Sequence, residues 1–255
     1  MAELNEKFEF EQDGKTYNLY DLPKGFVIKD DLDLFNKDLT ELPDLSGVIV
    51  EGDFSCSYNR LTSLKGAPQK VGGSFVCSAN RLTSLNGAPQ EVGEGFYCNC
   101  NQLTSLEGAP QKVGGCFDCH DNELFSLKNS PLKVSGDFIC SDNRLESLEG
   151  APKEVGENFV CELNELISLV GISQMKEDKR ILCDHSLAYK YGFKFESFTA
   201  KELYENQTFQ NEAKIDELRQ KKHQEDIEKR TKTTEKVQSA FDAWLKQNGK
   251  NTPEK

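Results

Sequence analysis

The sequence lacks long apolar runs and holds few of the residues that carry out catalysis. No stretch of its 255 residues approaches the roughly 20 apolar residues that span a bilayer, and residues 1–6 do not resemble a signal peptide. Only three histidines are present, and they form no Ser-His-Asp order, while the glycines recur as turn residues and not as a phosphate-binding loop. The sequence therefore predicts a non-enzymatic protein that needs no cofactor and does not associate with a membrane.

Positive charge is also scarce, and the deficit is confined to one part of the chain. The sequence has 31 Lys and Arg against 43 Asp and Glu, a net charge of −12. Residues 1–200 contain 32 of the acidic residues and only 19 of the basic ones, whereas residues 201–255 are nearly neutral. An acidic body of this kind repels phosphate, so we expect no direct binding to nucleic acid.

What the sequence has in abundance is a repeat of 21 residues. The fixed positions read Phe-x-Cys-x-x-Asn-x-Leu-x-x-Leu, followed by Gly-Ala-Pro and a Val in most copies. The Phe positions are Phe54, Phe75, Phe96, Phe117, Phe138 and Phe159, and each is followed two residues later by Cys and five residues later by Asn. A period of this length is typical of a solenoid.

The residue types of the repeat predict how each turn folds. Phe and Cys two residues apart point to the same face of a short strand, so stacked turns give a parallel sheet. The Asn follows the strand, and we expect its amide to bind backbone groups of its own turn and of the next one. Gly and Pro exclude a helix on the return leg. The sequence thus predicts a solenoid over residues 32–185, with a parallel sheet on its concave face and an extended, largely non-helical convex side.

The motif resembles the short-repeat leucine-rich proteins of tailed bacteriophages, and more distantly the leucine-rich repeats of bacterial secreted effectors. The resemblance covers roughly residues 32–171 and implies a leucine-rich-repeat scaffold, and a host-cell location if the chain is phage-encoded. It implies no reaction, because such proteins share a scaffold and not a chemistry. A ubiquitin ligase of the effector kind needs a C-terminal Cys nucleophile, and no Cys follows Cys183. A parallel β-helix is the alternative architecture, because it also stacks Asn and Phe at such periods.

Nine cysteines are present, and the spacing of four of them suggests a metal site that the repeat does not support. Cys98 and Cys100, followed by Cys116, Cys119 and His120, resemble the ligand spacing of a zinc site. The repeat register, however, places Cys98 and Cys119 in the core. Only Cys100, Cys116 and His120 then remain as candidate ligands, and we attribute their proximity in the sequence to chance, so we expect no metal. Stacked free thiols indicate a reducing compartment, and therefore a cytoplasmic location.

Both ends of the solenoid are expected to be capped. Residues 1–31 predict an N-terminal cap with a β-hairpin around Asp13 and Gly14, and residues 186–198 a C-terminal cap. Residues 199–255 predict a helical, charged and partly flexible tail. Within it, four residues at helical spacing predict an apolar stripe that contacts the cap, a partner or a second copy: Val237, Phe241, Trp244 and Leu245.

Because the inward positions form the core, any binding site must use the outward ones. These positions vary from turn to turn, and several of them mix apolar and acidic side chains in a way that suits a protein partner. The residues predicted to contact this partner are Tyr58, Val76, Tyr97, Asn99, Asp118, His120, Asp121, Ile139, Val160 and Glu162.

The sequence therefore predicts a protein–protein interaction module whose partner is unidentified and whose oligomeric state is open. Two alternatives remain. The chain is an acidic mimic of nucleic acid that inhibits a host defence or DNA-binding protein, or it is an assembly protein that oligomerises through its C-terminal helix.

Overall fold

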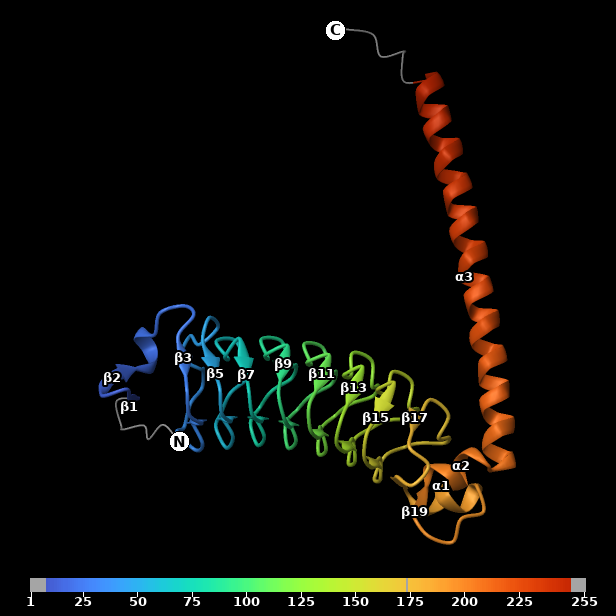
Figure 1. Ribbon diagram of the computed structural model, residues 1–255. Coiled ribbons are helices and arrows are strands. Elements are labelled where there is room, and N and C mark those ends of the chain that lie inside the picture. Colours follow the sequence, from blue (N-terminus) through green and yellow to red (C-terminus); the bar gives the residue numbers. More distant parts are fainter. Residues whose placement is uncertain (1–7, 173, 249–255) are drawn as a thin grey trace. The chain divides into compact units, whose positions relative to one another are not determined.

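A computed structural model describes residues 8–172 and 174–248, which fall into two compact units (Figure 1). The first unit extends to Phe209 and the second begins at Gln210. The first unit is a parallel-strand β-solenoid with a short cap at each end, and the second is helical. The first unit thus includes a short helix after residue 199, in a segment that the sequence analysis assigned to the tail.

One face of the solenoid is a sheet of very short strands, here called the Phe sheet. Its nine strands lie in the order β19-β18-β16-β14-β12-β10-β8-β6-β4. The 21-residue spacing sets its register, since Phe96 on β10 pairs with Phe75 on one side and Phe117 on the other. The strands are β4 (Leu32–Asp33), β6 (Phe54–Ser55), β8 (Phe75–Val76), β10 (Phe96–Tyr97), β12 (Phe117–Asp118), β14 (Phe138–Ile139), β16 (Phe159–Val160), β18 (Arg180–Leu182) and β19 (Ser197–Thr199), of which only β19 is antiparallel.

The return legs form a second parallel sheet, here called the Val sheet, with the order β17-β15-β13-β11-β9-β7-β5-β3. The sequence analysis expected an extended, non-helical return leg, which is confirmed for the turns from Phe54 to Leu169, but it missed the hydrogen-bonded ladder. Only one Val per turn is fixed in this segment, so the sequence carries no strand alternation there. Its strands are β3 (Val27–Ile28), β5 (Ile49–Val50), β7 (Lys70–Val71), β9 (Glu91–Val92), β11 (Lys112–Val113), β13 (Lys133–Val134), β15 (Glu154–Val155) and β17 (Gln174–Met175).

The core between the two sheets is built from identical side chains stacked turn upon turn. The rings of the six Phe residues lie 5.2–5.7 Å apart, centroid to centroid, and are fully buried. All nine cysteines are free, and the seven in the core column are buried. The Cys98 thiol donates to the carbonyl of Asp118 on the next turn at 3.4 Å, and the same bond recurs on later turns. Burial of these thiols confirms that Cys serves here as a small core residue.

The Asn residues form a ladder along the end of the Phe sheet. The Asn101 amide donates to the carbonyls of Cys98 on its own turn (3.0 Å) and Cys77 on the preceding turn (3.1 Å), and its oxygen accepts from the Leu82 N–H (3.0 Å). The ladder is confirmed, but the expected direction is wrong: each amide reaches the preceding turn and not the next one. It satisfies backbone groups that the two-residue strands leave unpaired.

The N-terminal cap is the expected hairpin. Strands β1 (Glu9–Gln12) and β2 (Lys15–Asn18) pair antiparallel around Asp13 and Gly14, both of which have positive φ, and the 3₁₀ helix η1 (Leu19–Asp21) follows. The Gln12 side chain donates to the Val27 carbonyl and accepts from the Lys29 N–H, both at 2.9 Å. One amide side chain thereby occupies the open edge of the Val sheet.

The C-terminal end is covered by α1 (His185–Lys190), β19 and α2 (Ala200–Tyr204). Leu187, Phe198 and Leu203 are buried there, and Thr199 and Glu202 form a capping box. The Tyr204 hydroxyl accepts from the Met175 N–H at 3.1 Å, so this cap also protects an edge of the Val sheet.

Helix α3 (Gln207–Asn248) begins in the last residues of the first unit, and from Gln210 onward it forms the described part of the second unit. This confirms the helical tail. In its described part, the large aliphatic side chains Ile215, Leu218 and Ile227 are exposed. The side chains of Val237, Phe241, Trp244 and Leu245 lie outside the part of the chain that the structure describes. Among the described helices, none combines the length and the apolar composition required to span a bilayer.

Candidate functional site

The outward side chains of the Phe sheet form one continuous surface, here called the Phe-sheet face. It is made of the residues immediately before, immediately after, three after and four after each Phe-column residue, from Asp31 to Leu163. Strand pairing places Val76, Tyr97, Asp118, Ile139 and Val160 side by side on successive turns. The structure therefore brings the central residues of the predicted site together in one row.

These residues differ in their exposure, which depends on their neighbours. Val76, Tyr97, Ile139 and Val160 are half-buried, as are Asn99, His120 and Glu162 in the adjacent column. Asp118 is only 9% exposed. The face thus presents apolar side chains that are held in place and still accessible.

The residue before each Asn lies at the rim of the face in the left-handed backbone region. Tyr58 and Asp121 occupy this position with φ of 56° and 53°, and both are exposed. This conformation suits Asp but costs energy for a Tyr. The repeat turn, and not the residue type, therefore determines where these two predicted contact residues point.

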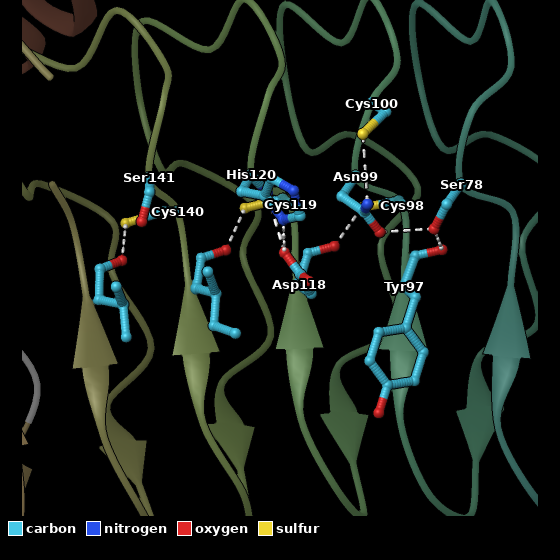
Figure 2. A network of polar contacts seen from close by, with 12 residues as sticks. Ser78, Tyr97, Cys98, Asn99, Cys100, Asp118, Cys119, His120, Cys140 and Ser141 are labelled. Atoms are coloured by element: carbon cyan, nitrogen blue, oxygen red, sulfur yellow. Dashed lines mark hydrogen bonds and ion pairs between the residues drawn. The ribbon is translucent and has the colours of Figure 1, made fainter. Parts of the chain in front are cut away.

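A network of hydrogen bonds fixes the middle of the face (Figure 2). The Ser78 hydroxyl lies 2.5 Å from the Asn99 amide oxygen and 3.3 Å from the Tyr97 carbonyl, and donates to them. The Asn99 amide in turn donates to the Cys100 sulfur at 3.4 Å. These bonds link two neighbouring turns through side chains, so this part of the face is preorganised.

Asp118 and His120 form a second short polar contact in the site. Oδ1 of Asp118 lies 2.7 Å from Nδ1 of His120 and accepts the His120 backbone N–H at 3.0 Å (Figure 2). The pair fixes the imidazole ring and leaves Nε2 for other partners. Among the described residues, no Ser, Cys or Lys side chain hydrogen-bonds to the His120 ring, whose contact is with Asp118.

The Tyr97 ring lies over Gly95, because that position has no side chain. A Cβ at Gly95 would meet the ring at 2.4 Å and the hydroxyl oxygen at 2.7 Å. Burial raises the pKa of Tyr97, and the nearby Cys116, Asp118, Glu94 and Asp53 add to the rise. The ring is therefore surrounded by groups that carry or can acquire negative charge. No role was predicted for Gly95. A signal was visible in the sequence, because Gly95 is the only Gly among the residues that immediately precede the Phe column.

A second acidic group lies toward the C-terminal end of the face. Burial raises the pKa of Glu162, and the neighbouring Asp184 and Glu196 raise it further. The Asp184 carboxylate accepts the backbone N–H groups of Leu163 (2.8 Å) and Asn164 (3.3 Å), which holds it in place. Negative charge thus accumulates at both the middle and the end of the face.

At the other end of the face, the predicted contact residue Tyr58 forms an exposed aromatic pair with Phe35, which was not predicted. Phe35 and Tyr58 lie on adjacent turns with ring centroids 5.1 Å apart, and they are 47% and 62% exposed. The signal was present in the sequence. Leu32 takes the place of Phe54 in the first turn, 22 residues earlier, so Phe35 stands in the same outward column as Ser57.

The residues that resembled a zinc site do not form one. Cys98 and Cys119 are in the core, whereas Cys100 and Cys116 are half-exposed on the face. Within residues 8–172 and 174–248, no group of three or more His, Cys, Asp or Glu side chains is placed to hold a metal ion.

Comparison of the chain with protein-family models, curated proteins and solved structures finds no match.

Proposed function

We propose that this chain is a non-enzymatic protein-binding module, and that the Phe-sheet face is its binding surface. The observation that carries the proposal is the contrast between the two sets of columns: the inward columns are nearly invariant and almost entirely buried, while the residue types of the outward columns vary along the solenoid. At about 4.8 Å per strand, the parallel strands extend the face to a length that suits a protein partner. Half-buried apolar side chains bordered by charged ones are typical of such surfaces.

We also propose that the solenoid is of the leucine-rich-repeat type. The two Leu columns after the Asn, and the Asn ladder itself, support this assignment. Parallel β-helices share the second ladder on the return leg, so that feature does not separate the two. We further propose a reducing, cytoplasmic location, in the host cell if the gene is viral, because seven free thiols stack in the core.

Affinity capture with matched variants tests the binding surface. The face variant is Tyr97→Ala/Ile139→Ala/Val160→Ala, which removes apolar contacts from three turns. The control is Phe125→Ala/Leu132→Ala, which removes two exposed apolar side chains that lie off the face, 55% and 50% exposed. We expect the face variant to reduce recovery of the bound partner by about tenfold while the control retains it. Equal recovery by both variants, with circular dichroism confirming that both fold, would contradict the proposal.

We propose helix α3 as a second contact, since its exposed aliphatic residues Ile215, Leu218 and Ile227 have no core of their own. Long isolated helices gain most of their stability from packing. Light scattering on the full chain and on a chain that ends at Asp226 separates a partner contact from self-association. We expect equal oligomeric state for the two; a smaller assembly for the shorter chain would instead favour oligomerisation through the helix.

A further inference from the structure

The Phe-sheet face carries an excess of negative charge, and among its acids Asp137 is acted on by a Lys from outside the face, Lys179. Over the turns from β4 to β16, its four columns of outward positions contain no Lys or Arg. They contain the following acidic residues: Asp31, Asp33, Asp53, Asp118, Asp121, Asp137, Asp142 and Glu162. This excess follows from the outward positions alone and does not depend on the net charge of the chain.

Elsewhere on the described solenoid, several acidic side chains are paired with basic ones. On the Val sheet, Lys70 lies 2.7 Å from Glu91 and Lys133 lies 2.7 Å from Glu154. At the turns after the Asn ladder, Arg144 pairs with Glu123. The Phe-sheet face differs from these surfaces, since its charges are left to act outward into solvent.

The acids of the face are held mainly by backbone N–H groups. Asp53 accepts the N–H of Ser74 at 2.6 Å, and Asp137 accepts that of Asn158 at 2.8 Å. Such bonds fix a carboxylate without adding a cationic side chain. The rise in the pKa of Glu162, caused by burial and then by Asp184 and Glu196, agrees with a surface where negative charge is concentrated.

The apolar residues of the face lie between these acids. Tyr97 and Ile139 flank Asp118 on the neighbouring turns, and Val160 follows Ile139. From Tyr97 to Val160 the row extends about 14 Å, the length of a short stretch of extended polypeptide. A ligand that covers this row must provide apolar contacts together with positive charge.

We infer that the ligand of the Phe-sheet face is a protein segment in which Lys or Arg side chains adjoin apolar ones. This inference rests on the proposed function and specifies its partner. The apolar side chains pack on Tyr97, Ile139 and Val160, while the basic side chains lie against Asp121, Asp142 and Glu162. Nucleic acid and anionic lipid are unsuited to the face because its acids repel their phosphates and no Lys or Arg within it attracts them.

A selection from a library of short random peptides, displayed on yeast and sorted against the full-length protein, tests the inference. We expect the peptides that bind wild type and fail to bind Tyr97→Ala/Ile139→Ala/Val160→Ala to be enriched in Lys and Arg next to apolar residues. Dissociation constants are then measured for one selected peptide by fluorescence anisotropy, at low and at moderate salt.

Two charge variants provide the decisive comparison. Asp121→Asn/Asp142→Asn/Glu162→Gln removes charge from the face and spares Asp118, which holds His120. Glu107→Gln/Glu146→Gln/Glu165→Gln removes the same charge from exposed positions off the face. We expect the first variant to weaken peptide binding by about tenfold and to flatten its salt dependence, and the second to leave the dissociation constant unchanged.

Each contrary result has a separate meaning. Peptides that depend on the face but carry no excess of Lys and Arg, or that bind both charge variants equally, overturn this inference and leave the proposed function intact. Peptides that need the acids but bind the apolar triple variant normally also overturn it, and favour a purely electrostatic surface such as a nucleic-acid mimic presents. If no selected peptide depends on the face, the proposed function falls as well.

Discussion

At the scale of single residues, the stacked thiols have the clearest chemical consequence. Burial raises the pKa of every thiol in the core column, to about 12 for Cys183 and further above the ordinary value for the others. The folded protein therefore keeps these thiols protonated under conditions in which the unfolded chain releases their protons.

This difference predicts a loss of stability in alkali. Because the folded-state pKa is the higher one, the stabilisation is complete below the unfolded-state pKa of about 8.5 and decreases as the pH rises above it. Each buried thiol adds about 1.4 kcal/mol per pH unit to the decrease. Urea unfolding measured between roughly pH 8 and pH 10 should show this slope, and Cys119→Ala/Cys140→Ala should reduce it by two such increments.

The control for this measurement is Val113→Ala, which removes volume from the buried core without removing a thiol. It should leave the slope unchanged. A slope that is the same in wild type and in the double core variant would show that the stacked thiols do not keep their protons.

Residue-scale features were the least predictable from the sequence. The repeat register identified the buried Cys and Phe columns correctly, because hydrophobic identity at a fixed spacing leaves little freedom. The direction of the Asn amides was predicted wrongly, since both neighbouring turns offer carbonyls at the same spacing. The placement of the Tyr97 ring over Gly95 depends on a close contact that no periodicity encodes.

At the scale of one element, the return leg depends on its glycine turn. Gly108 has a φ of +90°, and a Cβ there would lie 2.4 Å from the carbonyl carbon of Leu85 on the preceding turn. The equivalent position one turn later is Asn129, which has a φ of 68°. The turn thus requires a left-handed residue in every repeat, and where turns pass this closely it also requires a small one.

Gly108→Ala should therefore lower the free energy of unfolding by about 3 kcal/mol, through backbone strain and through the contact with the preceding turn. Asn129→Gly is the matched change at the same position of the next turn. It removes the strain of a side chain, so we expect a change below about 1 kcal/mol. Urea unfolding followed by circular dichroism measures both; equal effects of the two changes would contradict the strain argument.

The architecture of the elements followed from the sequence only in part. Fixed Phe and Cys positions with alternating outward residues predicted the Phe sheet and its register. The Val sheet escaped prediction because its repeated Val is preceded by an exposed Lys or Glu and followed by Gly or Ser, a pattern that a loop also shows. The hydrogen bonds of the Val sheet form between identical turns that stack on one another, so the sequence of a single turn does not reveal them.

At the scale of the whole molecule, stability should follow the division into two units. A solenoid is stabilised by contacts between neighbouring turns and requires caps at its ends. The C-terminal cap ends with α2 and Phe209, whose ring lies 6.1 Å from that of Tyr191 and 6.3 Å from that of Tyr204, centroid to centroid. The residues from Gln210 onward belong to the second unit.

A chain that ends at Phe209 should therefore unfold with the same urea midpoint as the full chain when the β-sheet signal is followed by circular dichroism. A chain that ends at Thr199 lacks α2, and with it the fully buried Leu203 and the Tyr204 hydroxyl that binds the Met175 N–H. This second truncation should lower the free energy of unfolding by about 3 kcal/mol or more, because it exposes core and leaves an edge of the Val sheet unpaired. If the chain that ends at Phe209 instead unfolds at a lower urea midpoint than the full chain, stabilising contacts of the first unit extend beyond Phe209, and this boundary does not separate two independent units.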